Sequence, residues 1–524
     1  MRSDETTLKP RRWTRVLFLA AGAAAAQQPP PTPTFRAGTE LVQVNVVAQD
    51  QNGKPVAGLR REEFRLFDNG VPQEFPLFVA ETGTGSPPPA VRAPNTFTNR
   101  IEAAAGERSG YSVIVLDNLV SGFGDPITGE EGTGFGVGKV LRTLRTMPPG
   151  EKIAVYTFGR RLQIVSEFTS DRDFLERRLR TWKPSIDDAQ IGPDLCGGGD
   201  PSDPANSSRL LALAAPGAIA LIVRARAGCM AVDLRLRVSS MDGELQQIAD
   251  HLSGIPGRKK LIWMANRFPI AGGPGVLKLA NAGVAIYPVD ENGVFAPSPD
   301  QVQMKALAAL TGGVAFFLRN DLDNAIEEAV EDDRVSYTLG FYPPQDKRPS
   351  IHQLVVLVSR PGVTLRYRAL YRSEKPRPVS ASPVDELVKA MNRPIDATAI
   401  PVSASATRSG DRLTVSASVD LPSLDLHLDQ GLWKGKAELI ARFVTAEGVA
   451  AGEVMARTVS FNLRPATYAR MLQTGFSCRG EWKVPPKAVE LKLLFANLAS
   501  GKVGTLSIPL SDIETATAGA THPR

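Results

Sequence analysis

The feature that most constrains the fold is an alternation of apolar runs with amphipathic segments between residues 111 and 330. Two of the runs, KLIWMA (Lys260–Ala265) and VAIYPV (Val284–Val289), are apolar along almost their whole length. Such runs are typical of strands in a parallel sheet that helices cover on both faces. Between the runs lie stripes with helical spacing, for example Val137, Val140, Leu141, Leu144 and Met147. The pattern predicts an α/β domain with a doubly wound, mostly parallel sheet.

Additional β-structure is predicted on both sides of this domain. Residues 35–80 hold short apolar runs around Asp68-Asn69-Gly70, a strong hairpin signal, and predict a small N-terminal β-unit. Three further strands are expected at 335–342, 351–359 and 363–371, closing the α/β domain as an antiparallel extension. From 398 onward apolar and polar residues alternate, which favours a C-terminal β-sandwich.

A chain of 524 residues is too long for one ordinary domain. The predicted organisation is a signal peptide at 1–26, a linker at 27–34, the β-unit at 35–80, a linker at 81–109, the α/β domain at 110–372, a linker at 373–397, the β-sandwich at 398–514 and a tail at 515–524. An insertion at about 184–235 interrupts the α/β domain. It is suited to be a lid, to bind a partner or simply to pack on the domain.

The N-terminus has the pattern of an export signal. Basic residues including Lys9 and Arg15 precede an apolar stretch from Val16 to Ala26, which ends in small residues typical of a cleavage site. That stretch is too short to span a bilayer, and no other segment is long and apolar enough. We therefore expect an extracytoplasmic protein, periplasmic or secreted, with no membrane span after signal removal.

The chain has three cysteines, and an oxidising compartment would permit a disulfide. Cys196 and Cys229 flank a Gly/Pro-rich part of the insertion and are the best candidate pair. Three unpaired thiols are an equal alternative. Cys478 is expected to be a small buried hydrophobic residue.

Several function classes are disfavoured. The net charge of +6 is spread along the chain without Lys/Arg runs or a recognised motif, so we expect no nucleic-acid partner. The four histidines lack zinc-site spacing, and no Gly-x-Ser-x-Gly elbow is present. The glycines of Gly132–Lys139 suggest a phosphate loop, but Val140 replaces the required Ser or Thr, and we expect a flexible loop there. We therefore expect no enzymatic activity and no organic cofactor.

Four stretches of the sequence together resemble one known family. They are LVQVNVVAQDQNGKPVAGLRREEFRLFDNGVPQEF, YSVIVLDNL, GIPGRKKLIWMANRFP followed by AGVAIYPVD, and YTLGFYPP followed by IHQLVVLVSRPGVTLRYRALY. Over about residues 38–372 the chain resembles the von Willebrand factor A-related domain family of acidobacteria. The resemblance implies a von Willebrand factor A-like fold and says little about the ligand.

In von Willebrand factor A-like domains, Asp-x-Ser-x-Ser with a Thr and an Asp from other loops holds a divalent cation. In this chain Asp117 and Ser121 match the first Asp and the second Ser, whereas Leu119 replaces the first Ser. Ala265-Asn266 stands where the second Asp is usual. The resemblance therefore implies an incomplete site for Mg²⁺ or Mn²⁺ at Asp117 and Ser121. The alternative is that the Asp117 carboxylate caps a loop or binds its own backbone.

These observations lead to one hypothesis with two alternatives. We expect an exported, non-enzymatic protein-binding or adhesion module that uses the top of the α/β sheet, with a degraded metal dependence. Its partner would be a protein or peptide of unknown identity. The first alternative is a structural component of the cell envelope without a working ligand site. The second is a hydrolase, which would need a carboxylate or a Ser/His pair converging in the fold.

Overall fold

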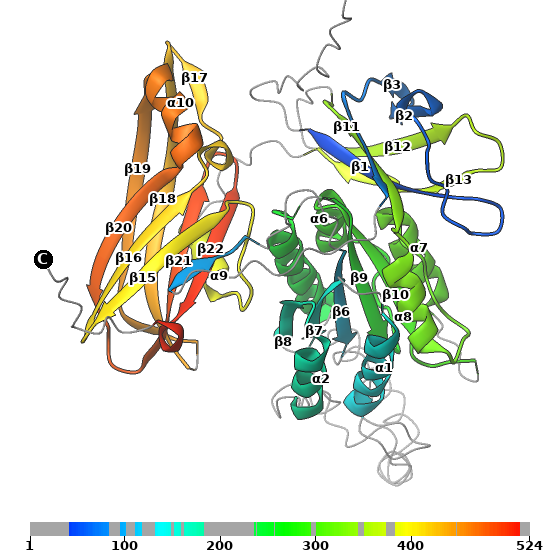
Figure 1. Ribbon diagram of the computed structural model, residues 1–524, viewed down its shortest axis with the longest axis horizontal. Coiled ribbons are helices and arrows are strands. Elements are labelled where there is room, and N and C mark those ends of the chain that lie inside the picture. The colour runs from blue at the N-terminus through cyan, green and yellow to red at the C-terminus, as the bar shows by residue number, and fades with distance from the viewer. Residues whose placement is uncertain are drawn as a thin grey trace, which may run out of the picture. The chain divides into compact units, whose positions relative to one another are not determined.

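The computed structural model describes most of the chain after residue 40 (Figure 1). The described residues are 41–82, 95–100, 110–117, 132–147, 151–158, 162–182, 235–236, 238–255, 257–294, 300–343, 350–373, 383–446 and 448–513. The predicted signal peptide, the pair Cys196 and Cys229, the tail and nearly all of the 184–235 insertion lie outside them. Among the described residues, no helix is long and apolar enough to cross a membrane.

The α/β domain is built on one five-stranded sheet. Its strands are β6 (Tyr111–Asp117), β7 (Lys152–Phe158), β8 (Gln163–Thr169), β9 (Lys259–Ala265) and β10 (Val284–Asp290). Their order in the sheet is β10-β9-β6-β7-β8, so the first strand in the chain lies between the second and the fourth, as in doubly wound folds. β8 pairs with β7 antiparallel, and the other pairings are parallel. The prediction is therefore confirmed in part, as a mixed α/β sheet with an antiparallel edge.

Helices cover both faces of this sheet because successive strand residues point to opposite sides. On one face, the helix over residues 238–252, α6 (Pro274–Asn281) and α7 (Gln301–Thr311) pack with Val113, Val115 and Trp263. On the other face, α1 (Gly132–Thr146), α2 (Arg172–Thr181) and α8 (Leu322–Glu331) pack with Ile114 and Leu116. The alternation of apolar runs and helical stripes thus produces two apolar cores, one on each face of the sheet.

The β-structure on both sides of this domain in the sequence forms one β-unit. It comprises β1 (Val42–Gln49), η1 (Arg61–Glu63), β2 (Phe64–Asp68), β3 (Val71–Gln73), β4 (Leu77–Thr82), β11 (Val335–Phe341), β12 (Ile351–Val358), β13 (Thr364–Arg366) and β14 (Leu370–Arg372). The two sheet orders are β13-β1-β11-β4 and β14-β12-β2-β3. The strands after residue 335 therefore pair with the N-terminal strands. The prediction that they extend the α/β sheet is wrong. The strands from the two parts of the chain share one apolar cluster. The few short strands of either part alone could not bury their apolar face.

The C-terminal part consists of two further sheets with one apolar cluster between residues of both. The first has the order β20-β16-β15-β5, from β20 (Phe476–Lys483), β16 (Arg412–Val419), β15 (Val402–Ser409) and β5 (Thr96–Thr98). The second contains β17 (His427–Asp429), β18 (Leu432–Thr445), β21 (Ala488–Asn497) and β22 (Lys502–Pro509), and β19 (Ala450–Leu463) also pairs with β18. Its short helices are α9 (Pro383–Asn392), α10 (Pro465–Thr474), η3 (Leu421–Leu424) and η4 (Leu510–Asp512).

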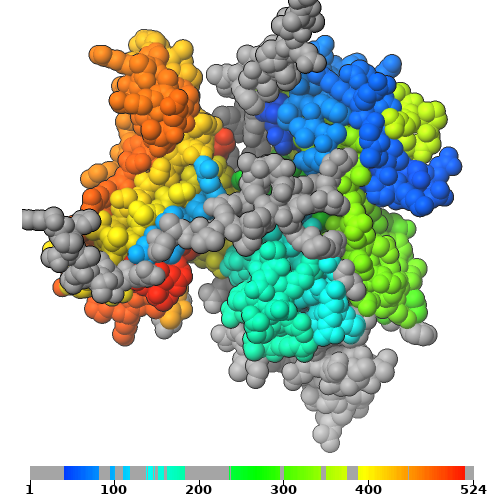
Figure 2. Space-filling view, in the orientation of Figure 1, coloured from blue at the N-terminus to red at the C-terminus, as the bar shows by residue number. Residues whose placement is uncertain are grey.

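β5 lies within the segment predicted to be a linker, and it pairs with residues Ser403–Ser405 of β15. Figure 2 shows this blue strip beside the yellow strands. Cys478 on β20 is partly buried and unpaired, and burial raises the pKa of its thiol.

Three consecutive cations begin β9, and all three are buried. Arg258, Lys259 and Lys260 are 5%, 2% and 0% exposed. Arg258 Nη2 donates to the carbonyl of Gly312 just after α7 (2.5 Å), and Lys259 Nζ donates to that of Ile255 after the 238–252 helix (2.6 Å). Lys260 Nζ donates to the carbonyl of Val330 in α8 (2.8 Å). Each cation therefore binds the carboxyl end of a different helix, where unpaired carbonyls and the helix dipole favour positive charge.

The three cations differ in their counter-charges. Lys260 Nζ lies 2.8 Å from Asp333 and 3.0 Å from Glu151, and these carboxylates raise its pKa although burial opposes the charge. Lys259 has no ion pair with any described residue within 4.0 Å. Burial lowers the pKa of Lys259 to about 7, with Glu81 opposing the effect and Arg368 adding to it.

Gly138 offers a test of the helix that contains the glycine-rich segment. It lies within α1, and a Cβ built there would meet nothing within 4 Å. Gly138→Ala should stabilise the protein by at most about 1 kcal/mol, because Ala loses less backbone entropy in a helix. Gly275→Ala in α6 should instead destabilise it, since its Cβ would lie 2.6 Å from the Asp242 carbonyl. Urea unfolding measures the change in the free energy of unfolding for each variant. If both changes had the same sign, they would contradict this packing.

The lowered pKa of Lys259 predicts that the free energy of unfolding depends on pH. Its folded-state pKa of about 7 lies below the unfolded-state value of about 10.4, so between these pH values the unfolded chain binds more protons. The free energy of unfolding should therefore rise with pH in this window, by at most about 1.4 kcal/mol per pH unit from this group. Lys259→Met should flatten the rise measured by urea unfolding, whereas Lys483→Met, at an exposed site, should not. Parallel pH curves for wild type and Lys259→Met would refute the assignment.

Candidate functional site

Two buried carboxylates stand at the carboxyl ends of the parallel strands. The strand registers pair Leu116 with Met264 and Asp290 with Ala265, which places Asp117, Ala265 and Asp290 at one level across three neighbouring strands. Residues at one level of a parallel sheet point to the same face. Asp117 ends the first strand beside the point where the strand order reverses, the usual ligand-binding position in doubly wound sheets.

The Asp117 carboxylate is held by an aromatic cluster beneath it. Asp117 is 2% exposed, and its Oδ2 accepts a hydrogen bond from Trp263 Nε1 at 3.0 Å. Trp263 lies two residues before the end of β9 on the same sheet face, and it packs edge-on against Phe158 and Phe268. Apolar packing therefore fills this face up to the level of Asp117, and one carboxylate oxygen has a fixed protein donor.

The loops that follow β9 and β10 are bound to each other by polar groups. Asp290 Oδ1 accepts from the backbone N of Asn292 (3.0 Å) and from its side-chain amide (2.7 Å). That amide also donates to the carbonyl of Asn266 (2.6 Å). The buried Asp300 accepts from Arg267 Nε (2.7 Å) and from the backbone N of Phe268 (2.9 Å). These bonds fix both loops at the top of the sheet.

The structure places only part of the site predicted from the sequence. Asp117 stands at the sheet top, whereas Ser121 and the rest of residues 118–131 lie outside the described residues. The glycine-rich segment from Gly132 belongs to α1, so the flexible loop expected there is wrong. Packing of Val140 and Leu144 in the core outweighs the low helix propensity of glycine. Asp290 was missed, although an Asp follows VAIYPV just as Asp117 follows YSVIVL.

The described residues do not by themselves fit a divalent-cation site. A hard cation takes six or more oxygen ligands, usually including several carboxylates. Among the described residues, no three His, Cys, Asp or Glu side chains are grouped closely enough to hold a metal. Asp117 and Asp290 lie two strands apart, roughly 10 Å between their Cα atoms from the usual strand spacing. We therefore assign no metal-dependent step to these residues.

A second polar constellation lies in the β-unit and was not foreseen. Ser350 Oγ lies 2.8 Å from His352 Nε2, and His352 Nδ1 lies 2.8 Å from Asp68 Oδ1. The other oxygen of Asp68 accepts from the Tyr371 hydroxyl at 2.7 Å. His352 and Asp68 are buried, and Ser350 is partly exposed at the start of β12. The order hydroxyl, imidazole, carboxylate is that of a hydrolase triad.

Comparison with known proteins finds similar folds only at low scores. No protein-family model matches the chain, and no curated protein matches it. BatB from Bacteroides thetaiotaomicron, a conserved hypothetical protein, is 11% identical over 43% of this chain and 98% of its own, with a TM-score of 0.27. Proximal thread matrix protein 1 of the mussel byssus is 11% identical over 43% and 48%, with a TM-score of 0.27. A von Willebrand factor type A protein from Catenulispora acidiphila is 11% identical over 64% and 74%, with a TM-score of 0.26.

Scores at this level do not assign the chain to a family. What places the candidate site is the strand order, the register at Asp117 and Asp290, and the hydrogen bonds between the loops. These features describe a mixed α/β domain with buried carboxylates and hydrogen-bonded loop residues at the carboxyl ends of its parallel strands.

Proposed function

We propose that this chain is an exported, non-enzymatic binding module that recognises a protein or peptide with the top of its α/β sheet. The carrying observation is the set of hydrogen bonds that fixes the loops after β9 and β10 above the level of Asp117 and Asp290. Residues that hydrogen bonds already hold in place lose little conformational entropy when a partner binds.

Two exposed side chains on these fixed loops would make contact. The Arg267 side chain is 54% exposed while its Nε stays bound to Asp300, so its position is set although it faces solvent. Val294, after β10, is 42% exposed, and its backbone N donates to Asn320 Oδ1 at 3.1 Å. A guanidinium on one of these loops and an apolar side chain on the other suit a protein surface that combines an acidic group with an apolar contact.

We further propose that this binding does not require a bridging metal. One Asp117 oxygen is committed to Trp263, and Asp290 is committed to Asn292. Both carboxylates then act mainly as acceptors that hold the sheet top together. Export rests on the N-terminal sequence pattern, and the likeness to the von Willebrand factor A-related family supports the fold that carries this surface.

The proposal is tested by a matched pair of surface variants. Full-length protein would capture partners from envelope and secreted fractions of its source organism, quantified by mass spectrometry. Val294→Asp should reduce capture at least about tenfold, as expected when a buried interface position receives an unpaired charge. Val449→Asp, in the turn between β18 and β19, should leave capture unchanged. Capture should also persist in EDTA. Equal loss in both variants, no loss in either, or no specific capture would refute the proposal.

A second candidate, ester or amide hydrolysis, is favoured by the geometry of Ser350, His352 and Asp68. In this reaction Ser350 Oγ would attack the substrate carbonyl carbon, His352 Nε2 would take the hydroxyl proton and return it to the leaving group, and water would release the acyl group. Asp68 would orient the imidazole. The same bonds also join β2, β12 and β14, which is sufficient reason for their presence.

Hydrolysis by this triad requires that Ser350→Ala lower the rate on p-nitrophenyl acetate by roughly a hundredfold or more. Ser373→Ala removes a neighbouring hydroxyl, 3.2 Å from Ser350 Oγ, and should retain the rate. Fluorophosphonate labelling followed by peptide mapping would place the nucleophile at Ser350. Equal background rates in all three proteins, with no label, would leave the network a structural one.

A further inference from the structure

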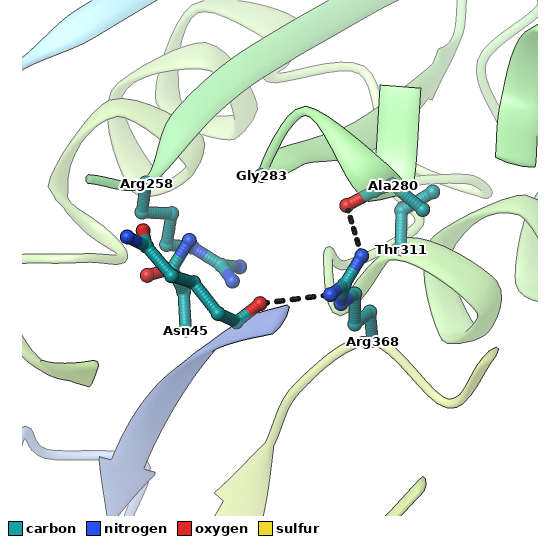
Figure 3. Close-up of a pocket in the computed structure, with 7 residues that line it drawn as sticks. Asn45, Arg258, Ala280, Gly283, Thr311 and Arg368 are labelled. Atoms are coloured by element: carbon teal, nitrogen blue, oxygen red, sulfur yellow. Dashed lines mark hydrogen bonds between the residues drawn. The ribbon is translucent and has the colours of Figure 1, made fainter. Parts of the chain in front are cut away.

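A small pocket lies at the end of the α/β sheet opposite to Asp117, where β9 and β10 begin. Its volume is about 10 Å³, enough for one particle the size of a water molecule. Residues of the β-unit, the loop before β14 and three segments of the α/β domain surround it (Figure 3). The lining residues are Gln43, Asn45, Arg258, Ala280, Gly283, Thr311 and Arg368.

Arg368 is a buried cation without a carboxylate partner among the described residues. It is 6% exposed, and its Nη1 donates to the Ala280 carbonyl (2.9 Å) and to Asn281 Oδ1 (3.1 Å). Its Nη2 donates to the Gln43 carbonyl (2.9 Å), and its Nε has no hydrogen-bond partner in the part of the chain that the structure describes. Burial lowers the pKa of Arg368 to about 10, so the guanidinium is charged at neutral pH without a full counter-charge.

Arg258 approaches the pocket from the other side, and Figure 3 shows both guanidinium groups extending toward the space between them. Its Nη2 donates to the Tyr287 hydroxyl (3.0 Å) and to the Gly312 carbonyl, and its Nε has no hydrogen-bond partner among the described residues. The nearest carboxylate to Arg258, Asp332, is 3.7 Å away and is shared with Arg366. Asp332 therefore serves two arginines, and Arg368 forms no ion pair with any residue that the structure describes.

Further donors come close to the same space at Gly283. A Cβ built on Gly283 would lie 3.0 Å from Asn45 Nδ2 and 3.4 Å from Lys259 Nζ. One acceptor, the Gly257 carbonyl oxygen, lies 3.2 Å from the same position. Two other acceptor oxygens nearby are already used, because Asn45 Oδ1 accepts from Thr338 and Thr311 Oγ1 accepts from the Ile286 backbone. N–H donors and positive charge therefore lie around the pocket together with the Gly257 carbonyl.

We propose that this pocket binds one small monovalent anion of the size of chloride, held by Arg258 and Arg368. Two buried guanidiniums with unpaired Nε groups disfavour an empty or purely apolar space, since buried charges need partners. The volume excludes phosphate, sulfate and carboxylate ligands, which have several heavy atoms, whereas a halide ion is a single atom. The anion supplies the counter-charge that the described residues lack at Arg368.

The test is anion-specific stabilisation of the full-length protein. Thermal unfolding would be followed at pH 7 in sodium chloride, sodium bromide and sodium gluconate at equal ionic strength. Chloride and bromide should give a saturable rise in Tm of roughly 2 °C or more over gluconate, because a ligand that binds only the folded state stabilises it. Crystals grown in bromide should show anomalous scattering in the pocket. Identical Tm values in the three salts, with no bromide signal, would overturn the proposal in favour of a bound water.

A charge-supplying variant provides the control for specificity. Asn45→Asp places a carboxylate in the pocket and keeps the oxygen that accepts from Thr338, so its Tm should no longer depend on chloride. Asn324→Asp adds the same charge at an exposed position of α8 and should keep the wild-type chloride dependence. Equal chloride dependence in both variants would contradict the site. The bromide measurement needs no variant, and it decides the question if Asn45→Asp fails to fold.

Discussion

The run Arg258-Lys259-Lys260 at the start of β9 is the constraint on which the α/β domain most depends. Its three cations bind carbonyls at the ends of three different helices, so one strand joins elements from both faces of the sheet. Removing one partner of a buried ion pair such as Lys260–Asp333 typically costs about 3–5 kcal/mol, far more than a surface pair contributes. The position of β9 is thereby fixed at its beginning, and the candidate site stands at its other end.

The charges at the two ends of the sheet follow one physical rule. In a doubly wound domain, helices finish where strands begin, and helix N-termini lie near strand carboxyl ends. One end of the sheet, near the helix C-termini, holds the cations Arg258, Lys259 and Lys260. The opposite end holds the carboxylates Asp117 and Asp290. Helix dipoles favour this distribution at both ends. The same rule explains why buried acidic groups at a sheet top can be structural acceptors without being metal ligands.

Local patterns in the sequence predicted the α/β domain, but long-range pairings escaped them. The apolar runs and helical stripes gave the strands and helices of the sheet, and the position of Asp117 followed from the run that precedes it. The pairing of β1 with β11 joins segments nearly 300 residues apart, which no local periodicity reports. The hydrogen bond between Asp68 and His352 likewise spans 284 residues. Asp290 had a local signal, the end of a strand-like run, whereas the unpaired state of Arg368 depends on tertiary packing alone.

The β-unit contributes residues to the Arg258–Arg368 pocket at one end of the α/β sheet, whereas the proposed binding surface lies at the other end. β1 and the segment through Arg366 and Arg368 come from opposite sides of the α/β domain in the sequence, and both reach the beginning of β9 and β10. Their arginines add positive charge there in excess of Asp332, which is why an anion would stabilise that end. Arg267 and Val294 lie at the other end, on loops held by Asp300 and Asn320. An anion at one end would therefore support the scaffold, while contacts with a partner depend on the loops at the other.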